Sequence, residues 1–199
     1  MKRSILKATL IGCTLLFGVP AKALIINVSE ILITPSALNT DGWLQVSEVI
    51  ASESGTGNDL ALASAGATAT GSSNWPGTVG PSATIDGVTP PAAALLEMFH
   101  SNENDHTSFL KITLAAPSAL DSITIFGTNQ HDLACCTHRD IYNLELRDAS
   151  GNLLYSASDI DATSGSVTNT LNAVPLPASV WLLGTGIFAL LGIGRRKQG

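Results

Sequence analysis

Basic residues are scarce in the middle of this sequence. Between residues 24 and 173 there are only three, Lys111, Arg139 and Arg147, against 16 acidic residues, which is a net charge of −13. A field of this sign repels phosphate backbones, so no nucleic acid is expected among the partners. The excess of carboxylates either attracts divalent cations or forms a solvated surface that keeps the protein soluble.

The motifs of common catalytic sites are also missing. The chain contains no G-x-S-x-G, no H-E-x-x-H and no Walker loop. Paired carboxylates such as Asp132 and Asp140 are present, but an acid–base pair needs a cleft that a sequence does not reveal. We therefore expect a protein that is not an enzyme, and a secreted hydrolase is the least favoured class.

The first 23 residues have the pattern of a signal peptide. A basic start, an apolar run over residues 8–19 and Ala21-Lys22-Ala23 supply the three parts of a cleavable export signal, so the mature chain is expected to begin near Leu24. The apolar run is about 12 residues long, whereas a membrane span needs roughly 20. A lipoprotein site at Cys13 is the alternative, but the apolar run continues past this cysteine.

The other end of the chain predicts a membrane anchor. Residues 178–194 are apolar or small, which is just enough for a transmembrane helix, and Trp181 suits the outer interface. The basic tail 195–199 would remain cytoplasmic. A buried core helix is the alternative, although the segment has no polar face.

A proline-rich motif precedes this predicted helix. Val174, Pro175, Leu176, Pro177 and Ala178 favour an extended approach to the membrane, because each proline disfavours helix at its own position and before it. Together with the helix, Arg195 and Arg196, this tail resembles the PEP-CTERM sorting signals in their Val-Pro-Leu-Pro-Ala variant, without the commoner Pro-Glu-Pro. The resemblance implies processing by an exosortase, a membrane protease-transpeptidase, at the surface of a Gram-negative bacterium, often one that makes exopolysaccharide. The chain would pass through the inner membrane to the cell surface or the extracellular matrix.

The middle of the chain is typical of an all-β sandwich. Short alternating apolar runs are separated by turn residues, and helical periodicity is nearly absent. We expect one domain over residues 24–166 and a linker with the sorting motif over 167–177. The predicted strands are 29–34, 43–51, 65–72, 108–114, 122–127, 142–148 and 153–158.

The order of these motifs resembles the galactose-binding-like jelly roll of the discoidin type, and especially the F-type lectins. The resemblance is carried by the segments 58–61, 67–73, 83–87, 99–102, 109–114, 120–125 and 132–139. Residues 29–34 and 43–49 are similar to the closing strands of that family moved to the front. This implies a circular permutation, which is reasonable because the ends of a domain often lie close together.

The resemblance implies a structural calcium ion. Calcium prefers six to eight oxygen ligands that include carboxylates. The matching positions are Glu48 and Asp86 as the carboxylates, with Ser47, Ala83, Val88, Ser101 and Asn102 as the other oxygen donors. The alternative is that Asp86 only begins a turn and Glu48 only lies exposed on a strand.

The resemblance also implies a sugar site near the adjacent cysteines Cys135 and Cys136. A vicinal disulfide would pack against the sugar, and free thiols or intermolecular bridges are the alternatives. Zinc binding is weakly supported, because His131 and His138 fit no standard ligand spacing. Arg139 matches a ligand-binding arginine, or forms a salt bridge to Asp132 or Asp140. His100 or His106 takes the place of the family's histidine, and Gln130 or His131 that of its other arginine.

Two hypotheses follow for the function. The first is a calcium-stabilised carbohydrate-binding module that holds an extracellular polysaccharide or glycan through residues 130–139. The second is a structural protein of a matrix or biofilm that binds no specific ligand.

Overall fold

The computed structural model describes residues 25–90, 96–102, 104, 106–128 and 134–171. These residues form a predominantly β structure in which all strand pairs are antiparallel. The strands are β1 (Ile25–Pro35), β2 (Gln45–Val46), β3 (Glu48–Glu53), β4 (Thr68–Gly71), β5 (Phe99–His100), β6 (Leu110–Phe126), β7 (Ile141–Arg147), β8 (Leu153–Asp161) and β9 (Ser166–Thr170). Short 3₁₀ helices occupy η1 (Ala63–Ala65), η2 (Pro81–Ile85) and η4 (Ala134–Arg139). The expectation of a β-rich chain is confirmed.

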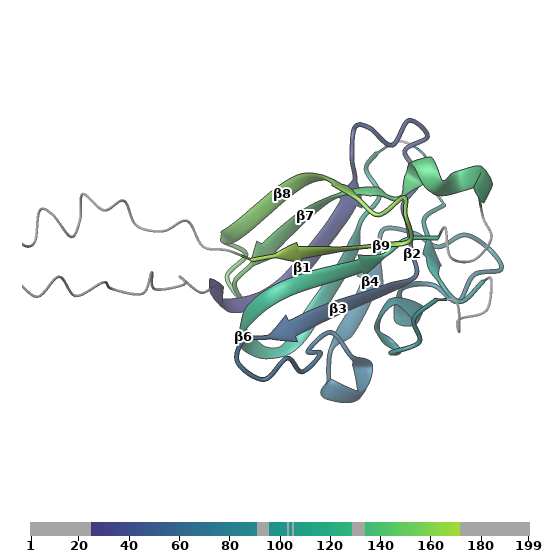
Figure 1. Ribbon diagram of the computed structural model, residues 1–199. Helices are drawn as coiled ribbons and strands as arrows, with labels where there is room; N and C mark the ends of the chain where they lie inside the picture. Colours follow the sequence, from purple (N-terminus) through teal and green to yellow (C-terminus); the bar gives the residue numbers. More distant parts are fainter. Residues whose placement is uncertain (1–24, 91–95, 103, 105, 129–133, 172–199) are drawn as a thin grey trace, which may run out of the picture. The chain divides into compact units, whose positions relative to one another are not determined.

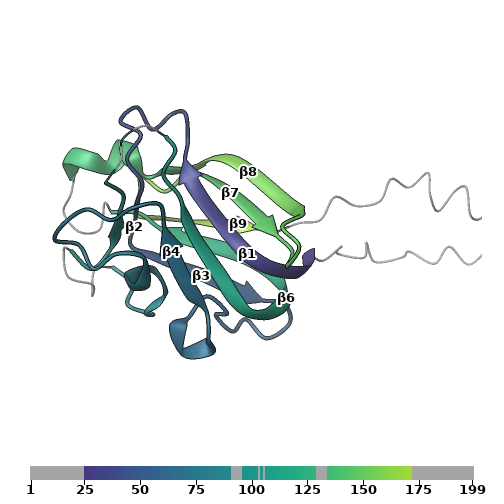
Figure 2. The same ribbon diagram turned by 180° about the vertical axis from the view of Figure 1, so that it is seen from behind.

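The long strand β6 connects two layers of strands. Its first part, residues 110–114, pairs with β1 and β4, and its last part, residues 120–126, pairs with β3 and β9. β7 pairs with β1 on the side away from β6, and β8 pairs with β7. β9 and β3 lie in front of β1 and β4 in Figure 1, and Figure 2 shows the reverse order from behind.

The core lies between these layers because apolar side chains alternate along the strands. In β7, Tyr142, Leu144 and Leu146 are fully buried and their neighbours are only partly so, which is the period of two expected for a strand with one buried face. The first part of β6 contributes Leu110 and Ile112. The second part contributes Leu120, Ile123 and Ile125, so both layers bury side chains in one cluster.

The two ends of the described domain meet at the same place in β6. Ile25 pairs with Leu120, and the Leu171 N–H donates to the Asp121 carbonyl at 2.8 Å. Figure 1 shows β1 beginning and β9 ending on the left, while β2 and η4 lie at the opposite end. The loops near β2 and η4 therefore lie at the opposite end of the domain from Ile25 and Leu171.

The structure changes three details of the predicted strands. The segment 43–51 is interrupted at Ser47 between β2 and β3, and the two strands predicted over 108–114 and 122–127 are one continuous strand. The predicted linker from residue 167 is wrong at its start, because β9 pairs with β6 there and Leu171 is 1% exposed in the core. Residues 166–170 have few large apolar side chains, so their sequence resembles a polar linker.

Several predictions lie outside the described residues. They are the signal peptide 1–23, the sorting motif 174–178, the anchor 178–194, the basic tail 195–199, and His131. Within the part of the chain that the structure describes, no helix is long and apolar enough to cross a membrane.

Candidate functional site

One buried asparagine ties the loop after β1 to the end of η4. The Asn39 side chain is fully buried, and its Nδ2 donates to the Trp43 carbonyl at 2.6 Å and to the Arg139 carbonyl at 3.2 Å. Its Oδ1 accepts from the Gly42 N–H at 3.1 Å. These bonds hold residues 39–43 against a residue 100 positions later in the sequence.

Arg139 forms a two-pronged ion pair within this loop contact. Its Nε and Nη2 donate to Asp41 Oδ2 at 3.0 and 2.9 Å, and His138 Nε2 lies 2.8 Å from the same oxygen. Asp41, from the other end of the domain sequence, is therefore the ion-pair partner of Arg139 in place of the predicted Asp140, and the other predicted partner, Asp132, lies outside the described residues. Asp140 is instead buried, where it accepts from the Thr128 N–H at 2.8 Å.

Three aromatic rings gather beside this ion pair. The ring centroids of Trp43, Trp75 and His100 lie 5.2–5.3 Å from one another. The guanidinium carbon of Arg139 lies 5.7 Å from the centre of the Trp43 ring, which is a cation–π distance. The strand pair β2–β5 places His100 near Trp43. The backbone N–H of Trp75 donates to the backbone carbonyl of His100 at 2.7 Å.

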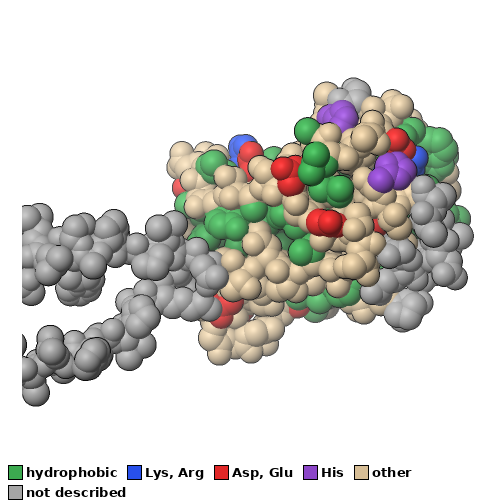
Figure 3. Space-filling view, turned by 45° about the horizontal axis from the view of Figure 1, so that its top comes forward, with side chains coloured by type: hydrophobic (Ala, Val, Ile, Leu, Met, Phe, Trp, Pro, Cys, Tyr) green, Lys and Arg blue, Asp and Glu red, His purple; other side chains and the backbone are tan. Residues whose placement is uncertain are grey.

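We call these six residues the aromatic–arginine cluster: Asp41, Trp43, Trp75, His100, His138 and Arg139. Trp75 is 42% exposed, and the Arg139 side chain is 18% exposed. In Figure 3 a histidine, an acidic and a basic side chain lie together with hydrophobic side chains at the right of the molecule. The cluster thus offers aromatic surface and charged hydrogen-bonding groups at one accessible place.

Two titrating groups of the cluster have shifted pKa values. The hydrogen bonds from His138 and Arg139 lower the pKa of Asp41, so its carboxylate stays charged at neutral pH. Burial lowers the pKa of His100, and the positive charge of Arg139 lowers it further. A hydrogen bond to the Ser101 carbonyl acts in the opposite direction. His100 is therefore neutral at pH 7.

Cys136 lies in η4 three residues before Arg139 and is disulfide-bonded. The sequence has only two other cysteines, Cys13 and Cys135, and the structure describes the side chain of neither. The predicted cysteine, Arg139 and His100 are thus found in or next to one cluster.

The two carboxylates expected to bind calcium also come together. Glu48 begins β3 and is fully buried, with its Oε1 accepting from the Gly87 N–H at 3.3 Å in the turn that follows Asp86. Burial, followed by the nearby charge of Asp86, raises the pKa of Glu48 to about 8. Three buried side-chain atoms, Ser29 Oγ, Gln45 Oε1 and Glu48 Oε2, have no hydrogen-bond partner among the described residues, and only the last belongs to an acid. The alternative in which Glu48 lies exposed on a strand is therefore wrong.

The other predicted calcium ligands surround this pair only in part. Ala83 is buried in η2, and the exposed Val88 N–H donates to Asp86 Oδ1 at 2.7 Å. Ser47 precedes Glu48, and its Oγ donates to the Gly127 carbonyl at 3.0 Å.

Ser101 and Asn102 directly follow the neighbouring strand β5. The Leu44 N–H donates to Ser101 Oγ at 3.0 Å, so Ser101 lies beside Leu44, which is three residues before Ser47 in the sequence. The Asn102 N–H donates to Ser73 Oγ at 2.8 Å. In the described part of the chain no group of three or more histidine, cysteine, aspartate or glutamate side chains could hold a metal ion. A metal here would need Glu48, Asp86 and backbone carbonyls.

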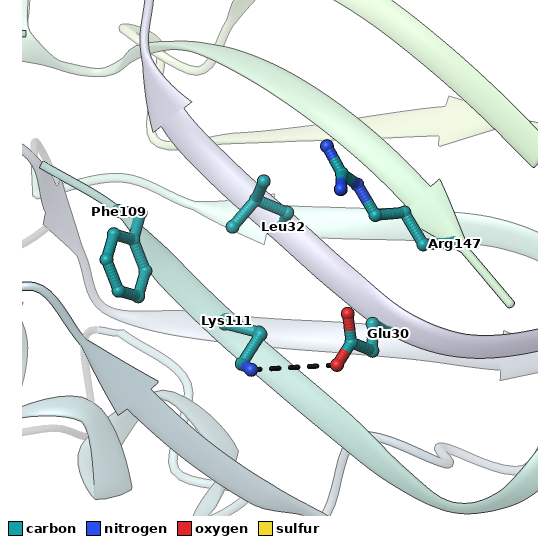
Figure 4. Close-up of a pocket in the computed structure, with 5 residues that line it drawn as sticks. All are labelled: Glu30, Leu32, Phe109, Lys111 and Arg147. Carbon is teal, nitrogen blue, oxygen red and sulfur yellow. Dashed lines mark ion pairs between the residues drawn. The ribbon is translucent and has the colours of Figure 1, made fainter. Parts of the chain in front are cut away.

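A shallow hollow lies elsewhere, over the outer face of β1, β6 and β7. Figure 4 shows its lining residues Glu30, Leu32, Phe109, Lys111 and Arg147. Lys111 Nζ lies 3.6 Å from Glu30 Oε1, and Arg147 Nη2 lies 2.6 Å from Glu145 Oε2. Because both cations are already paired, this hollow presents no unpaired charge to a ligand.

Sequence reasoning missed Asp41, Trp43 and Trp75 as site residues. Only three tryptophans occur in the chain, and these two lie at or near turns, but nothing local to either indicates that the rings meet. His138 was considered only for zinc. The aromatic–arginine cluster is assembled by contacts between residues far apart in the sequence.

Comparison with known proteins returned no family model, no curated protein and no solved structure that matches this chain.

Proposed function

We propose that this chain is an exported, non-enzymatic carbohydrate-binding module, and that the aromatic–arginine cluster is its sugar site. The observation that carries the proposal is the meeting of Arg139 and His100 with the rings of Trp43 and Trp75. Two of these residues were proposed from the sequence, and the two tryptophans come from the structure alone.

The chemistry of the cluster suits a sugar. A pyranose has faces of C–H groups that pack on aromatic rings and an edge of hydroxyls that both donate and accept hydrogen bonds. Binding sites for small molecules combine such apolar surface with a few oriented polar groups. Trp75 offers the exposed ring, while Arg139 and Asp41 offer charged donors and acceptors held in place by each other.

The proposed fold is a circularly permuted galactose-binding-like jelly roll. Its support is the antiparallel arrangement in two layers and the position of β1, which lies between β6 and β7 rather than at an edge. The pairing of Ile25 with Leu120 and of Leu171 with Asp121 also supports it, because adjacent ends make a permutation feasible.

A structural calcium ion at Glu48 and Asp86 is part of the proposal. A buried carboxylate oxygen without a partner is costly, and a bound cation would offset both the lost hydration and the repulsion from Asp86. Carboxylate and backbone oxygens are the donors that calcium prefers. The Ala83 and Ser47 carbonyls are the additional donors that we propose.

Export and surface sorting complete the proposal. The disulfide of Cys136 supports an oxidising compartment. Once the signal peptide is cleaved off together with Cys13, Cys135 is the only cysteine left in the chain with which Cys136 can pair. We propose that an exosortase-type enzyme acts on the tail after residue 173 and that the module stays at the cell surface or in its matrix. Mass spectrometry of the protein recovered from the producing cells tests this: a mature start near Leu24 and a missing or altered tail are expected, and an intact tail in the surface fraction contradicts the sorting step.

The sugar site is tested with the full chain on a glycan array. A zwitterionic detergent without sugar keeps the apolar tail soluble, since a glycoside detergent would compete for the site. We compare the wild type with Arg139→Ala and with Arg147→Ala. Arg147 is a matched control because its Nε and Nη2 bind Glu145 Oε2 at 3.0 and 2.6 Å, in the same manner as Arg139 binds Asp41, but on β7.

The expected result is binding to a defined set of glycans that Arg139→Ala abolishes and Arg147→Ala leaves unchanged. A blank array from the folded wild type would favour the matrix or biofilm protein without a specific ligand. If Arg139→Ala and Arg147→Ala lose glycan binding equally, the aromatic–arginine cluster is not the sugar site.

A further inference from the structure

We infer that the aromatic–arginine cluster selects neutral hexose residues and rejects uronic acids and sulfated sugars. The inference rests on the proposed function of the same cluster and adds the chemical class of the sugar. It follows from the charge of the cluster and from the hydrogen-bonding atoms that remain unused, and the charge of the whole domain acts in the same direction.

The positive charge of Arg139 is already compensated. Two of its nitrogens bind Asp41 Oδ2, so the guanidinium and the carboxylate together carry no net charge. A third contact to the same oxygen comes from His138. Recognition of a sugar carboxylate or sulfate usually requires an uncompensated arginine or lysine, and the described residues place no other arginine or lysine in the cluster.

The ion pair still has one donor group and one acceptor to offer. No described residue bonds to Asp41 Oδ1 or to Arg139 Nη1, and both side chains are partly exposed. A carboxylate oxygen accepts, and a guanidinium nitrogen donates. Neighbouring hydroxyls of a sugar satisfy both atoms, because one hydroxyl donates while the other accepts. A uronate carboxylate only accepts, and it is repelled by Asp41.

The field of the domain acts in the same direction. Residues 24–173 carry a net charge of −13, which repels anionic polysaccharides. Salt limits this repulsion to a screening distance of about 8 Å at physiological ionic strength. The aromatic rings of the cluster do not distinguish a neutral sugar from an acidic one. Trp75, which is 42% exposed, would therefore bind the C–H face of either sugar, and Asp41 makes the distinction.

The test uses matched sugars that differ only at C6. Glucose and galactose oligosaccharides are compared with glucuronic and galacturonic acid oligosaccharides of the same length, by calorimetric titration of the full chain in the sugar-free detergent. We expect at least one neutral sugar to bind, and its uronic acid counterpart to bind at least tenfold more weakly at low salt. Raising the salt concentration should narrow the difference without removing it.

Two variants separate the charge from the ring. Asp41→Asn leaves Arg139 uncompensated, so the ratio of neutral to acidic affinity should fall about tenfold. Trp75→Ala should weaken both sugars by a similar factor and leave their ratio unchanged. Glu30→Gln is the control, because it removes one negative charge next to Lys111 on the outer face of β1, away from the cluster.

The outcomes distinguish the inference from the function on which it rests. If a uronic acid binds as tightly as its neutral counterpart, the inference is wrong while carbohydrate binding stands. If Glu30→Gln changes the ratio as much as Asp41→Asn does, the general field and not the ion pair selects the sugar, which also overturns it. If the folded wild type binds no sugar of either kind, the proposed function fails as well.

Discussion

Glu48 provides the sharpest test of the structure, because its ionisation is opposed by its surroundings. The side chain is fully buried, its Oε2 has no partner among the described residues, and Asp86 is close. The pKa of Glu48 is about 8 in the folded protein, against 4.5 for an ordinary glutamate. The perturbation is Glu48→Gln, which keeps the shape and removes the charge.

The expected size follows from these two pKa values. The folded protein keeps this proton between pH 4.5 and 8 while the unfolded chain has lost it, so stability is greatest below pH 4.5 and falls as the pH rises through 8. Each pH unit between these two pKa values lowers the free energy of unfolding by about 1.36 kcal/mol. The loss is about 3 kcal/mol at pH 7, where the folded protein holds a proton that the unfolded chain has released, and roughly 5 kcal/mol above pH 8, where Glu48 is ionised in both states. Glu48→Gln removes this dependence.

The assay is urea unfolding of the full chain with a chelator at pH 5, 7 and 9. The free energy of unfolding of the wild type should decrease by several kcal/mol relative to that of Glu48→Gln over this range. Taking the difference between the two proteins removes the effect of the histidines. Asp41, Asp148 and Asp161 do not interfere, because hydrogen bonds lower their pKa values and they titrate below this range.

Calcium adds a second arm to the same experiment. An ion that binds only the folded protein stabilises it by about 2.7 kcal/mol at a hundred times its dissociation constant. The gain should appear in the wild type and not in Glu48→Gln. Stability differences that are constant from pH 5 to 9 would refute the reasoning about burial, and an equal calcium effect on both proteins would place the ion elsewhere.

Three further predictions concern the core and are measured by the same unfolding assay at neutral pH. Tyr142→Phe should lower the free energy of unfolding by about 1–3 kcal/mol, because its buried hydroxyl donates to a backbone carbonyl at 2.6 Å; no loss would contradict that bond. Gly71→Ala should cost about 1–3 kcal/mol, since a Cβ there would lie 2.5 Å from the Phe99 ring, and a neutral effect would mean that the ring moves. Leu144→Ala should cost about 2–5 kcal/mol, whereas Leu153→Ala, at 56% exposure, should cost far less; equal losses would argue against the assigned faces.

The candidate site was only half predictable. Arg139 and His100 were proposed through a family resemblance, whereas Asp41 was not, although it is the partner that compensates the charge of Arg139. The two residues are 98 positions apart. Their contact depends on Asn39, which bonds to the carbonyls of both Trp43 and Arg139, and no local pattern shows where its amide will find partners.

The burial of the Glu48 side chain was not predictable from the sequence either. A glutamate at the start of an alternating strand is ordinarily a solvent-facing residue, and only the packing of β3 and the turn after Asp86 shows that it is enclosed. The pairing of Glu48 with Asp86 was anticipated from the resemblance. The raised pKa of Glu48 was not, because it depends on how much water the fold removes.

The alternation of apolar and polar residues in the sequence was enough to predict most of the strand segments and, in β7, the face that is buried. Tyr142, Leu144 and Leu146 point to one side because successive side chains of a strand alternate, which is a property of the backbone and not of its neighbours. The tertiary structure alone decided how the strands pair. β9 shows this, because its polar residues form a strand only through pairing with β6. The alternation of side chains is local, because it follows from the geometry of each strand's own backbone. Strand pairing and the burial of single side chains depend on how distant segments pack.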